Sequence, residues 1–391
     1  RLTRPSGFES FSTMKLPLLC LGLAVLAAAV PHQMVTERTI LERGQRLGVA
    51  HGWVLEKKAA ADDMVHLSIA LKHRNREQLE ALFWAVSDPK NQKYGQHLSL
   101  HQLGELIAPT HETLELVRSW LQSAGIQRSA ATINREFLAF SATVAQAEEL
   151  LETQFGVYSH SQLGLKVLRS EAPYSVPAHI SEVIDFVAGV HRFPSASPPK
   201  VQSSGQNHIL ATPGTLRKRY NLTSSDIGSA PDNIQAVAQF LGQHYSPLDL
   251  DEFFLEFALG FKHSHGVAKV VGPNHIPSGV EASLDIEYIM SLGANIPTWF
   301  WSTGGETAGQ EPFLQWMQDV ANATLAPYLF SVSYGDDEDS LSVEYMQRVN
   351  EEFQKAGVRG MSILFASGDS GAGCSQNNTF APSFPALSPF V

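Results

Sequence analysis

The chain has 391 residues, of which 43% are hydrophobic and 17% charged, and its formal net charge at pH 7 is −11. This length suffices for one large or two medium globular domains. The acidic balance argues against nucleic acid as a partner, because no basic stripe is present to neutralise phosphates.

Residues 14–31 have the pattern of a secretory signal peptide. Met14 and Lys15 precede roughly fifteen apolar residues that end in an alanine-rich run. The segment is too short for a stable membrane span, and no other stretch without charges reaches spanning length. Because the chain opens with Arg1, we expect Met14 to be the start and residues 1–13 to be an artefact of a partial gene model.

Cysteines and glycosylation sequons are compatible with secretory transit. Cys20 lies in the signal segment, so Cys374 is alone in the mature chain. It is either free or paired with a cysteine outside this sequence. N-glycosylation sequons begin at Asn221, Asn322 and Asn377.

Strands and helices are mixed over residues 35–194, which predicts an α+β domain. The alternation of apolar side chains predicts a strand at residues 64–72. Amphipathic patterns and their capping residues predict helices at 76–86, 99–107, 110–124 and 145–151. A linker rich in Pro, Ser and Gly follows at 195–206, and we expect it to be exposed and easily cleaved.

The pattern changes over residues 207–391, where short apolar strands alternate with helices. The strands are expected at residues 236–241, 267–271, 298–301, 328–333 and 362–366. The helices are expected near residues 247–258, 280–292, 311–323 and 342–356. This alternation predicts an α/β fold, with a parallel sheet that is covered on both faces. Functional residues of such sheets gather beyond the carboxyl ends of the strands.

Glu281 and Asp285 lie four residues apart on one of these helices, and therefore on one face of it. Two carboxylates held so close tend to share a proton and to titrate at different pH values. Such a pair suits acid–base chemistry at acidic pH, where histidine is protonated and no longer a base. The alternative is a solvated helix face, which is the ordinary outcome for this spacing.

Residues 368–371 read Gly-Asp-Ser-Gly, a tetrapeptide that also surrounds the nucleophile of chymotrypsin-class peptidases. That fold would require many antiparallel strands, an upstream catalytic histidine and paired cysteines. The alternating strands and helices and the single cysteine of this region exclude that class.

Three motifs resemble those of the sedolisins, which are serine-carboxyl peptidases with a subtilisin-like catalytic domain. They are Glu-Ala-Ser-Leu-Asp at 281–285, Ser-Val-Ser-Tyr-Gly-Asp at 331–336 and Phe-Ala-Ser-Gly-Asp-Ser-Gly-Ala-Gly at 365–373. The segments at 217–223, 309–316 and 334–340 are most similar to lysosomal members that release tripeptides. The resemblance runs from about residue 35 to residue 391. It implies a subtilisin-like sheet, incomplete here, preceded by an activation prodomain at residues 35–194.

The resemblance also implies catalytic roles. Glu281 would be the general base that takes the proton from a serine nucleophile. Asp285 would be hydrogen-bonded to Glu281 and hold the proton of the pair in place. Asp369 would lie in the oxyanion hole as a protonated acid and donate a hydrogen bond to the developing negative oxygen. A neutral aspartic acid requires low pH or a strongly desolvated site.

A substrate-binding segment is implied next to these residues. Ser333, Tyr334 and Gly335 would form the edge that binds the substrate backbone. Asp336 would help to hold a free substrate amino terminus. The alternative is that Asp336, with its acidic neighbours at 337 and 339, merely lies at the beginning of a helix.

Two parts of the family pattern are not in these 391 residues. The nucleophile motif Ser-Gly-Thr-Ser-x-Ser does not occur, and the C-terminal loops that hold the structural calcium ion of the family are missing. We therefore expect a chain that is truncated within the catalytic domain and is inactive as written. Its full-length parent would be a lysosomal precursor that releases tripeptides from free amino termini of polypeptides at acid pH, with its prodomain as an intramolecular inhibitor. The alternative is a secreted, non-catalytic protein whose prodomain binds and inhibits peptidases.

Histidines are concentrated before the linker. Histidine gains charge as pH falls below about 6.5. Any histidine that is buried neutral against the catalytic domain would destabilise the prodomain as pH falls, and would thereby expose the linker. The test set consists of His66, His97, His101 and His111, and the alternative is that most of these histidines are exposed. The ten histidines of this region are His32, His51, His66, His73, His97, His101, His111, His160, His179 and His191.

Overall fold

The structure is a computed structural model that describes residues 37–44, 52–132, 134–161, 165–193, 211–230, 232–258, 266–303, 312–369, 371 and 380–391. Residues Glu37–Val391 form one compact unit. The expected signal peptide, the linker at 195–206, Cys374 and Asn377 lie outside the described residues.

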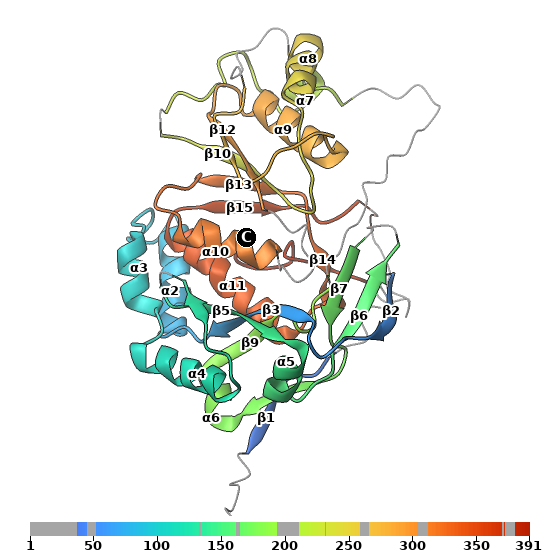
Figure 1. Cartoon of the computed structure of the whole chain (residues 1–391). Helices are drawn as coiled ribbons and strands as arrows, with labels where there is room; N and C mark the ends of the chain where they lie inside the picture. The colour runs from blue at the N-terminus through green and yellow to red at the C-terminus, as the bar shows by residue number, and fades with distance from the viewer. Residues whose placement is uncertain are drawn as a thin grey trace, which may run out of the picture. The chain divides into compact units, whose positions relative to one another are not determined.

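A five-stranded parallel sheet forms the centre of the C-terminal half (Figure 1). Its strand order is β11-β12-β10-β13-β15, and every pairing in it is parallel. Ala236 and Ala238 pack into one hydrophobic cluster, whereas Val237 between them packs into another. This alternation places apolar side chains on both faces, and the predicted doubly covered sheet is confirmed. The strands are β10 (Gln235–Gln239), β11 (Lys269–Val271), β12 (Thr298–Ser302), β13 (Leu329–Val332) and β15 (Ser362–Phe365).

Helices cover both faces of this sheet. On one face α8 (Pro247–Phe257) and α9 (Val280–Leu292) pack against Val237 and Phe300. On the other face α10 (Pro312–Asn322) and α11 (Val343–Val358) bury the larger aromatic cluster. The remaining elements of this half are α7 (Pro213–Arg219), β14 (Asp336–Asp337), the 3-10 turn η1 (Glu338–Ser340) and β16 (Ser383–Phe384).

The N-terminal half is α+β, as predicted. Its sheets have the strand orders β4-β5-β3-β9, β2-β6-β7 and β1-β8, and their pairings are antiparallel. Its strands are β1 (Arg38–Glu42), β2 (Trp53–Lys58), β3 (Met64–Leu71), β4 (Ser129–Ala131), β5 (Phe137–Thr143), β6 (Gly156–His160), β7 (Leu165–Arg169), β8 (Tyr174–Pro177) and β9 (Ile184–Ala188). Its helices are α2 (Arg76–Ser87), α3 (Leu100–Ile107), α4 (His111–Ser123), α5 (Val144–Leu151) and α6 (Ala178–Ser181).

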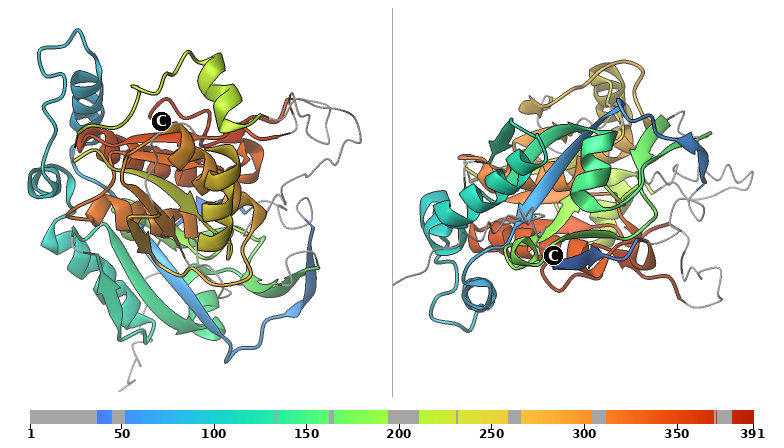
Figure 2. Two further views of the ribbon diagram at one scale, coloured as in Figure 1. Left: turned by 90° about the horizontal axis from the view of Figure 1, so that it is seen from above. Right: turned by 60° about the horizontal axis from the view of Figure 1, so that its bottom comes forward.

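Helix α11 is shared by the two halves. It packs against α2 and β9 on one side and against α10 and β15 on the other. Figure 1 shows it between the parallel sheet and the strands of the N-terminal half, and Figure 2 shows the same molecule from two other sides. Ala70, Phe137 and Phe186 of the N-terminal half belong to the same buried cluster as the aromatic residues of α10 and α11. A continuous hydrophobic core therefore joins the halves.

None of the helices in the described part of the chain combines the length and the apolar character that a membrane span requires.

Candidate active site

Strand ends bring three polar side chains to one edge of the parallel sheet. Gln239 is the last residue of β10, Ser333 follows β13 directly, and Asp369 lies in the segment that follows β15. Because parallel strands present their carboxyl ends at the same edge, these residues meet although they are far apart in sequence.

Helix α9 supplies the two predicted carboxyl groups. Ala282, Ile286 and Met290 recur every four residues and are buried against the sheet. Glu281 and Asp285 each precede one of these positions, so they lie at the margin of the buried face and are half-buried. The helix thus directs both carboxyl groups toward the sheet edge without burying them completely.

Asp285 is held by two hydrogen bonds. The Ser333 hydroxyl donates to its Oδ1 at 2.8 Å, and the Gln239 side-chain amide donates to its Oδ2 at 2.6 Å. Ser333 also interacts with the Glu281 carboxyl group. The expected direct hydrogen bond between Glu281 and Asp285 stays a prediction, because the hydrogen bonds observed on Asp285 come from the sheet.

Burial makes this pair of carboxyl groups unusually weak acids. Burial, together with the charge of Glu281, raises the pKa of Asp285 to about 7, although the hydrogen bonds from Ser333 and Gln239 oppose the shift. Burial also raises the pKa of Glu281, and the nearby charge of Asp369 adds to this shift. At mildly acidic pH the pair therefore still carries a proton that ordinary carboxyl groups would have lost.

Gln239 is a site residue that sequence reasoning missed. Its side chain is fully buried, and while its amide nitrogen donates to Asp285, its Oε1 accepts a hydrogen bond from the Tyr334 hydroxyl at 3.1 Å. Tyr334 also donates to the carbonyl oxygen of Phe240 at 3.3 Å. The available signal was a polar residue at the carboxyl end of a strand whose central residues are apolar, which suggests a buried partner.

The segment after Ser333 leads away from the carboxyl pair. A Cβ atom at Gly335 would lie 2.9 Å from the carbonyl oxygen of Phe384, so this close approach to β16 requires glycine. Asp336 is in β14, and its side chain, only 7% exposed, accepts a hydrogen bond from Arg192 of the N-terminal half at 2.6 Å. The alternative of acids at the beginning of a helix is wrong for Asp336, which lies in an antiparallel strand pair, but Asp337 is the N-cap of the 3-10 turn η1 and Asp339 lies in its first turn.

Asp369 is exposed and lies close enough to Glu281 to affect its charge. Glu281, Asp285, Ser333 and Asp369 are therefore brought together, whereas Asp336 is placed in β14, in contact with the N-terminal half.

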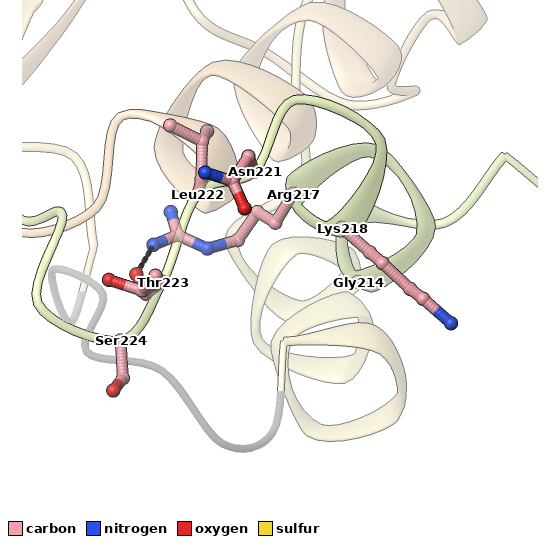
Figure 3. A pocket seen from close by; sticks show the side chains of 7 residues that line it. All are labelled: Gly214, Arg217, Lys218, Asn221, Leu222, Thr223 and Ser224. Atoms are coloured by element: carbon pink, nitrogen blue, oxygen red, sulfur yellow. Dashed lines mark hydrogen bonds between the residues drawn. The ribbon is translucent and has the colours of Figure 1, made fainter.

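The described sequons differ in their surroundings. Asn221 is exposed and lines a surface pocket of about 350 Å³ (Figure 3). In that pocket Arg217 donates to the carbonyl oxygen of Thr223, and Lys218 points away from it. Asn322 is half-buried at the end of α10, where its side-chain nitrogen donates to the carbonyl oxygen of Gln318.

A buried ion-pair cluster lies between α11 and the N-terminal half. His73, Glu136 and Glu352 come close enough together to hold a metal ion. However, the Lys355 ammonium group lies 2.7 Å from Glu136 and 2.5 Å from Glu352, and it already supplies the positive charge that the two carboxylates need. We therefore interpret this cluster as part of the contact between the halves and not as a metal site.

The four histidines chosen as the test set for a pH trigger are not buried in the structure. His66, His97, His101 and His111 are all exposed, so the expected burial against the catalytic half does not apply to them. Of the ten histidines before the linker, those that are buried or partly buried within the described residues include His73, His160 and His191.

Comparison with known proteins identifies the family. Residues 51–193 match the family described as Pro-kumamolisin, activation domain. The chain is 46% identical over 361 residues to tripeptidyl-peptidase 1 of Mus musculus, which covers 90% of this chain and 64% of the relative. The human (Homo sapiens) protein of that name is 44% identical over 362 residues, again covering 90% of this chain and 64% of the relative.

The dog (Canis lupus familiaris) tripeptidyl-peptidase 1 is 43% identical over 390 residues, covering 97% of this chain and 68% of the relative. The chain therefore spans about two thirds of the length of these curated relatives. With this identity over nearly its whole length, and with an activation domain at residues 51–193, the chain belongs to the tripeptidyl-peptidase 1 family.

Proposed function

We propose that this chain is the N-terminal part of a lysosomal serine-carboxyl peptidase precursor that releases tripeptides from free amino termini at acid pH. The observation that carries the proposal is the pair of half-buried carboxyl groups, Glu281 and Asp285, at the carboxyl edge of a parallel sheet. The pKa of Asp285, raised to about 7, keeps a proton on this pair under acidic conditions. The proposed catalytic domain is subtilisin-like, and residues 195–206 form the linker that is cleaved on activation.

In the proposed reaction, Glu281 accepts the proton of a serine hydroxyl as its oxygen attacks the scissile carbonyl carbon. Asp285, fixed by Ser333 and Gln239, keeps the second proton of the pair and limits the negative charge at the site. Asp369 donates a hydrogen bond to the oxyanion. Glu281 then returns its proton to the leaving amine.

The segment from Ser333 to Asp336 supports the release of tripeptides. Three residues of extended chain span about 10 Å. A substrate that pairs with residues 333–335 therefore places its amino terminus near Asp336 when its third carbonyl group is near the carboxyl pair. The partners of the enzyme are polypeptides with free amino termini and its own prodomain. The resemblance puts the ligands of a structural calcium ion in C-terminal loops, so no residue of this chain is assigned to it.

Glu281→Gln in the full-length enzyme tests the proposed base. Its kcat should fall at least about 100-fold, because general-base catalysis typically contributes that much. Asp369→Asn should have a milder effect, since an amide can still donate a hydrogen bond. The readout is hydrolysis of a tripeptide amide with a free amino terminus.

Glu287→Gln is the matched control. Glu287 lies on the same helix and burial raises its pKa to about 7, but it faces Asp249 and not the sheet edge. Near-normal kcat in Glu281→Gln, or an equal loss in both variants, would contradict the proposed role.

A further inference from the structure

Arg192 of the N-terminal half carries a positive charge into the segment that follows Ser333. Its Nη2 lies 2.6 Å from Asp336 Oδ2, and its Nη1 donates to the Tyr345 hydroxyl. The guanidinium carbon also lies 4.7 Å from the centre of the Tyr345 ring. A carboxylate and an aromatic face thus surround one cation.

Asp336 is suited to bind a cation in its own right. Its side chain is only 7% exposed, and among the described residues its ion pair is the one with Arg192. Its second oxygen, Oδ1, is buried without a hydrogen-bond partner in the described part of the chain. A buried carboxylate that loses its counter-ion is strongly destabilised, so removal of Arg192 leaves a site that favours another cation.

Tyr345 completes the site and is itself fixed. It lies in the first turn of α11, where its backbone N–H donates to the Ser342 side chain that caps the helix. In the precursor its ring also packs against Phe186 of β9 at a centroid distance of 5.7 Å, a contact that ends when the N-terminal half leaves, whereas the hydrogen bond to Ser342 stays within the catalytic half. Since Tyr345 and Asp336 both belong to the catalytic half, they remain when the prodomain leaves, whereas Arg192 leaves with it.

We propose that Asp336 and Tyr345 form the binding site for the α-ammonium group of the substrate, and that Arg192 fills this site in the precursor as a built-in substitute for that group. This inference rests on the proposed function and adds to it Tyr345 as a binding residue and Arg192 as the blocking cation. The prodomain then inhibits by occupying the position that selects substrates with free amino termini, about 10 Å from the carboxyl pair.

The competing explanation is that Arg192 and Asp336 form an ordinary ion pair of the interface. The two explanations differ in whether the ammonium group of a peptide takes the place of Arg192 when the arginine is removed. The first experiment uses the full-length precursor at neutral pH with Arg192→Gln, and titrates it calorimetrically with trialanine and with N-acetyl-trialanine. The parent precursor should bind neither peptide. The Arg192→Gln precursor should bind trialanine at least about ten-fold more tightly than the acetylated peptide, because only the free amine carries the charge.

Arg76→Gln is the matched control. Arg76 also belongs to the N-terminal half and pairs with Asp185 and Glu351, but it does not touch Asp336. Its loss should loosen the interface without creating a preference for the free amine. The inference is overturned if Arg192→Gln shows no such preference while the activated parent enzyme does. If the activated parent enzyme also fails to distinguish the peptides, the proposed function fails with it.

The second experiment avoids any variant of Arg192. Methylguanidinium should inhibit the activated enzyme competitively with a tripeptide amide substrate, because it reproduces the Arg192 head group. Asp336→Asn should raise its inhibition constant about ten-fold or more, and should raise KM for the substrate more than it lowers kcat. Tyr345→Phe should raise both constants less, since it keeps the ring face. Non-competitive inhibition, or an inhibition constant unchanged by Asp336→Asn, would refute the assignment.

Discussion

Gln239 has no chemistry of its own to offer, yet it bonds to both Asp285 and Tyr334. The Tyr334 hydroxyl donates a hydrogen bond to Oε1 and so fixes the orientation of the amide group. In this orientation the amide nitrogen donates to Asp285. The donated hydrogen bond favours the ionised form of Asp285 and so opposes the effect of burial. Gln239 is therefore a positioning residue that adjusts how readily the carboxyl pair exchanges its protons.

Replacement of Gln239 by leucine should raise the pKa of Asp285 further and lower kcat about ten-fold, as expected for a lost hydrogen bond to a charged group. The pH–rate profile should move toward higher pH, while KM should change little. Gln235→Leu is the control, because Gln235 is a buried glutamine at the opposite end of the same strand, bonded to Thr298 and α9. A profile that stays in place in Gln239→Leu would exclude the positioning role.

The carboxyl pair on α9 could be predicted from the sequence, whereas Gln239 could not. Glu281 and Asp285 were predictable because four residues on a helix fix their mutual position locally. Gln239 depends on the parallel register of β10 with β13 and on the packing of α9 over that edge, which are contacts between distant parts of the chain. The same holds for Arg192, whose partner Asp336 lies 144 residues away.

Among the elements, α11 has the most unusual composition for its environment. It is a 16-residue helix in which Arg348, Glu352 and Lys355 are buried along with its apolar residues. Arg348 and Lys355 pair with Asp185 and Glu136 of the N-terminal half, and both also pair with Glu352 within the helix. Amphipathic periodicity alone would have assigned the charged side to solvent.

The parallel strands were predictable because each is an apolar run. Strands such as β7, Leu-Lys-Val-Leu-Arg at Leu165–Arg169, mix charged and apolar residues and depend on pairing with β6, so sequence reasoning did not find them. Element type was thus predicted well where a strand is an apolar run and poorly where pairing decides.

Replacement of Lys355 by methionine should destabilise the full-length precursor by about 3–5 kcal/mol, because buried Glu136 loses its lysine partner and Glu352 keeps Arg348 but loses the second cation. The measurement is the urea-unfolding midpoint at neutral pH. Lys166→Met is the control, since Lys166 is 65% exposed and pairs with Glu56 at the surface. This change should leave the midpoint almost unaltered. Equal effects of both changes would mean that the buried cluster has no special role.

For the molecule as a whole, the groups between its halves respond to pH in opposite directions. Burial raises the pKa of Glu42, which accepts a hydrogen bond from Ser342 at the start of α11, from 4.5 to about 7. Its contribution to stability is therefore complete below about pH 4.5 and is lost as pH rises through 7. Acidification strengthens this contact, so Glu42 does not release the prodomain.

The carboxylates with lowered pKa values do not begin the release of the prodomain, because they take up protons only at a lower pH. Arg348 and Arg76 hold the pKa of Asp185 below its ordinary value against the effect of burial, and Lys355 does the same for Glu136. Their contributions are present above their ordinary pKa values and are lost as pH falls through the lowered ones. Most of that loss lies below about pH 4.

His191 is the group whose response falls in the required range. It lines a cavity of about 300 Å³ with Glu42 and Tyr345, and its Nδ1 lies 2.9 Å from the carbonyl oxygen of Ser170. Burial lowers its pKa from the ordinary value of 6.5. The released state therefore takes up a proton first, and the docked state loses stability as pH falls through 6.5 and on toward the lowered pKa.

A full-length precursor with His191→Gln should consequently mature at a lower pH than the parent, because glutamine can still donate to Ser170 but cannot become charged. The measurement is the pH midpoint at which the precursor is converted to the mature enzyme, followed by gel electrophoresis after transfer to buffers of decreasing pH. A precursor in which the exposed His66, His97, His101 and His111 are all glutamine should keep the parent midpoint. If His191→Gln also keeps it, His191 is excluded as the trigger.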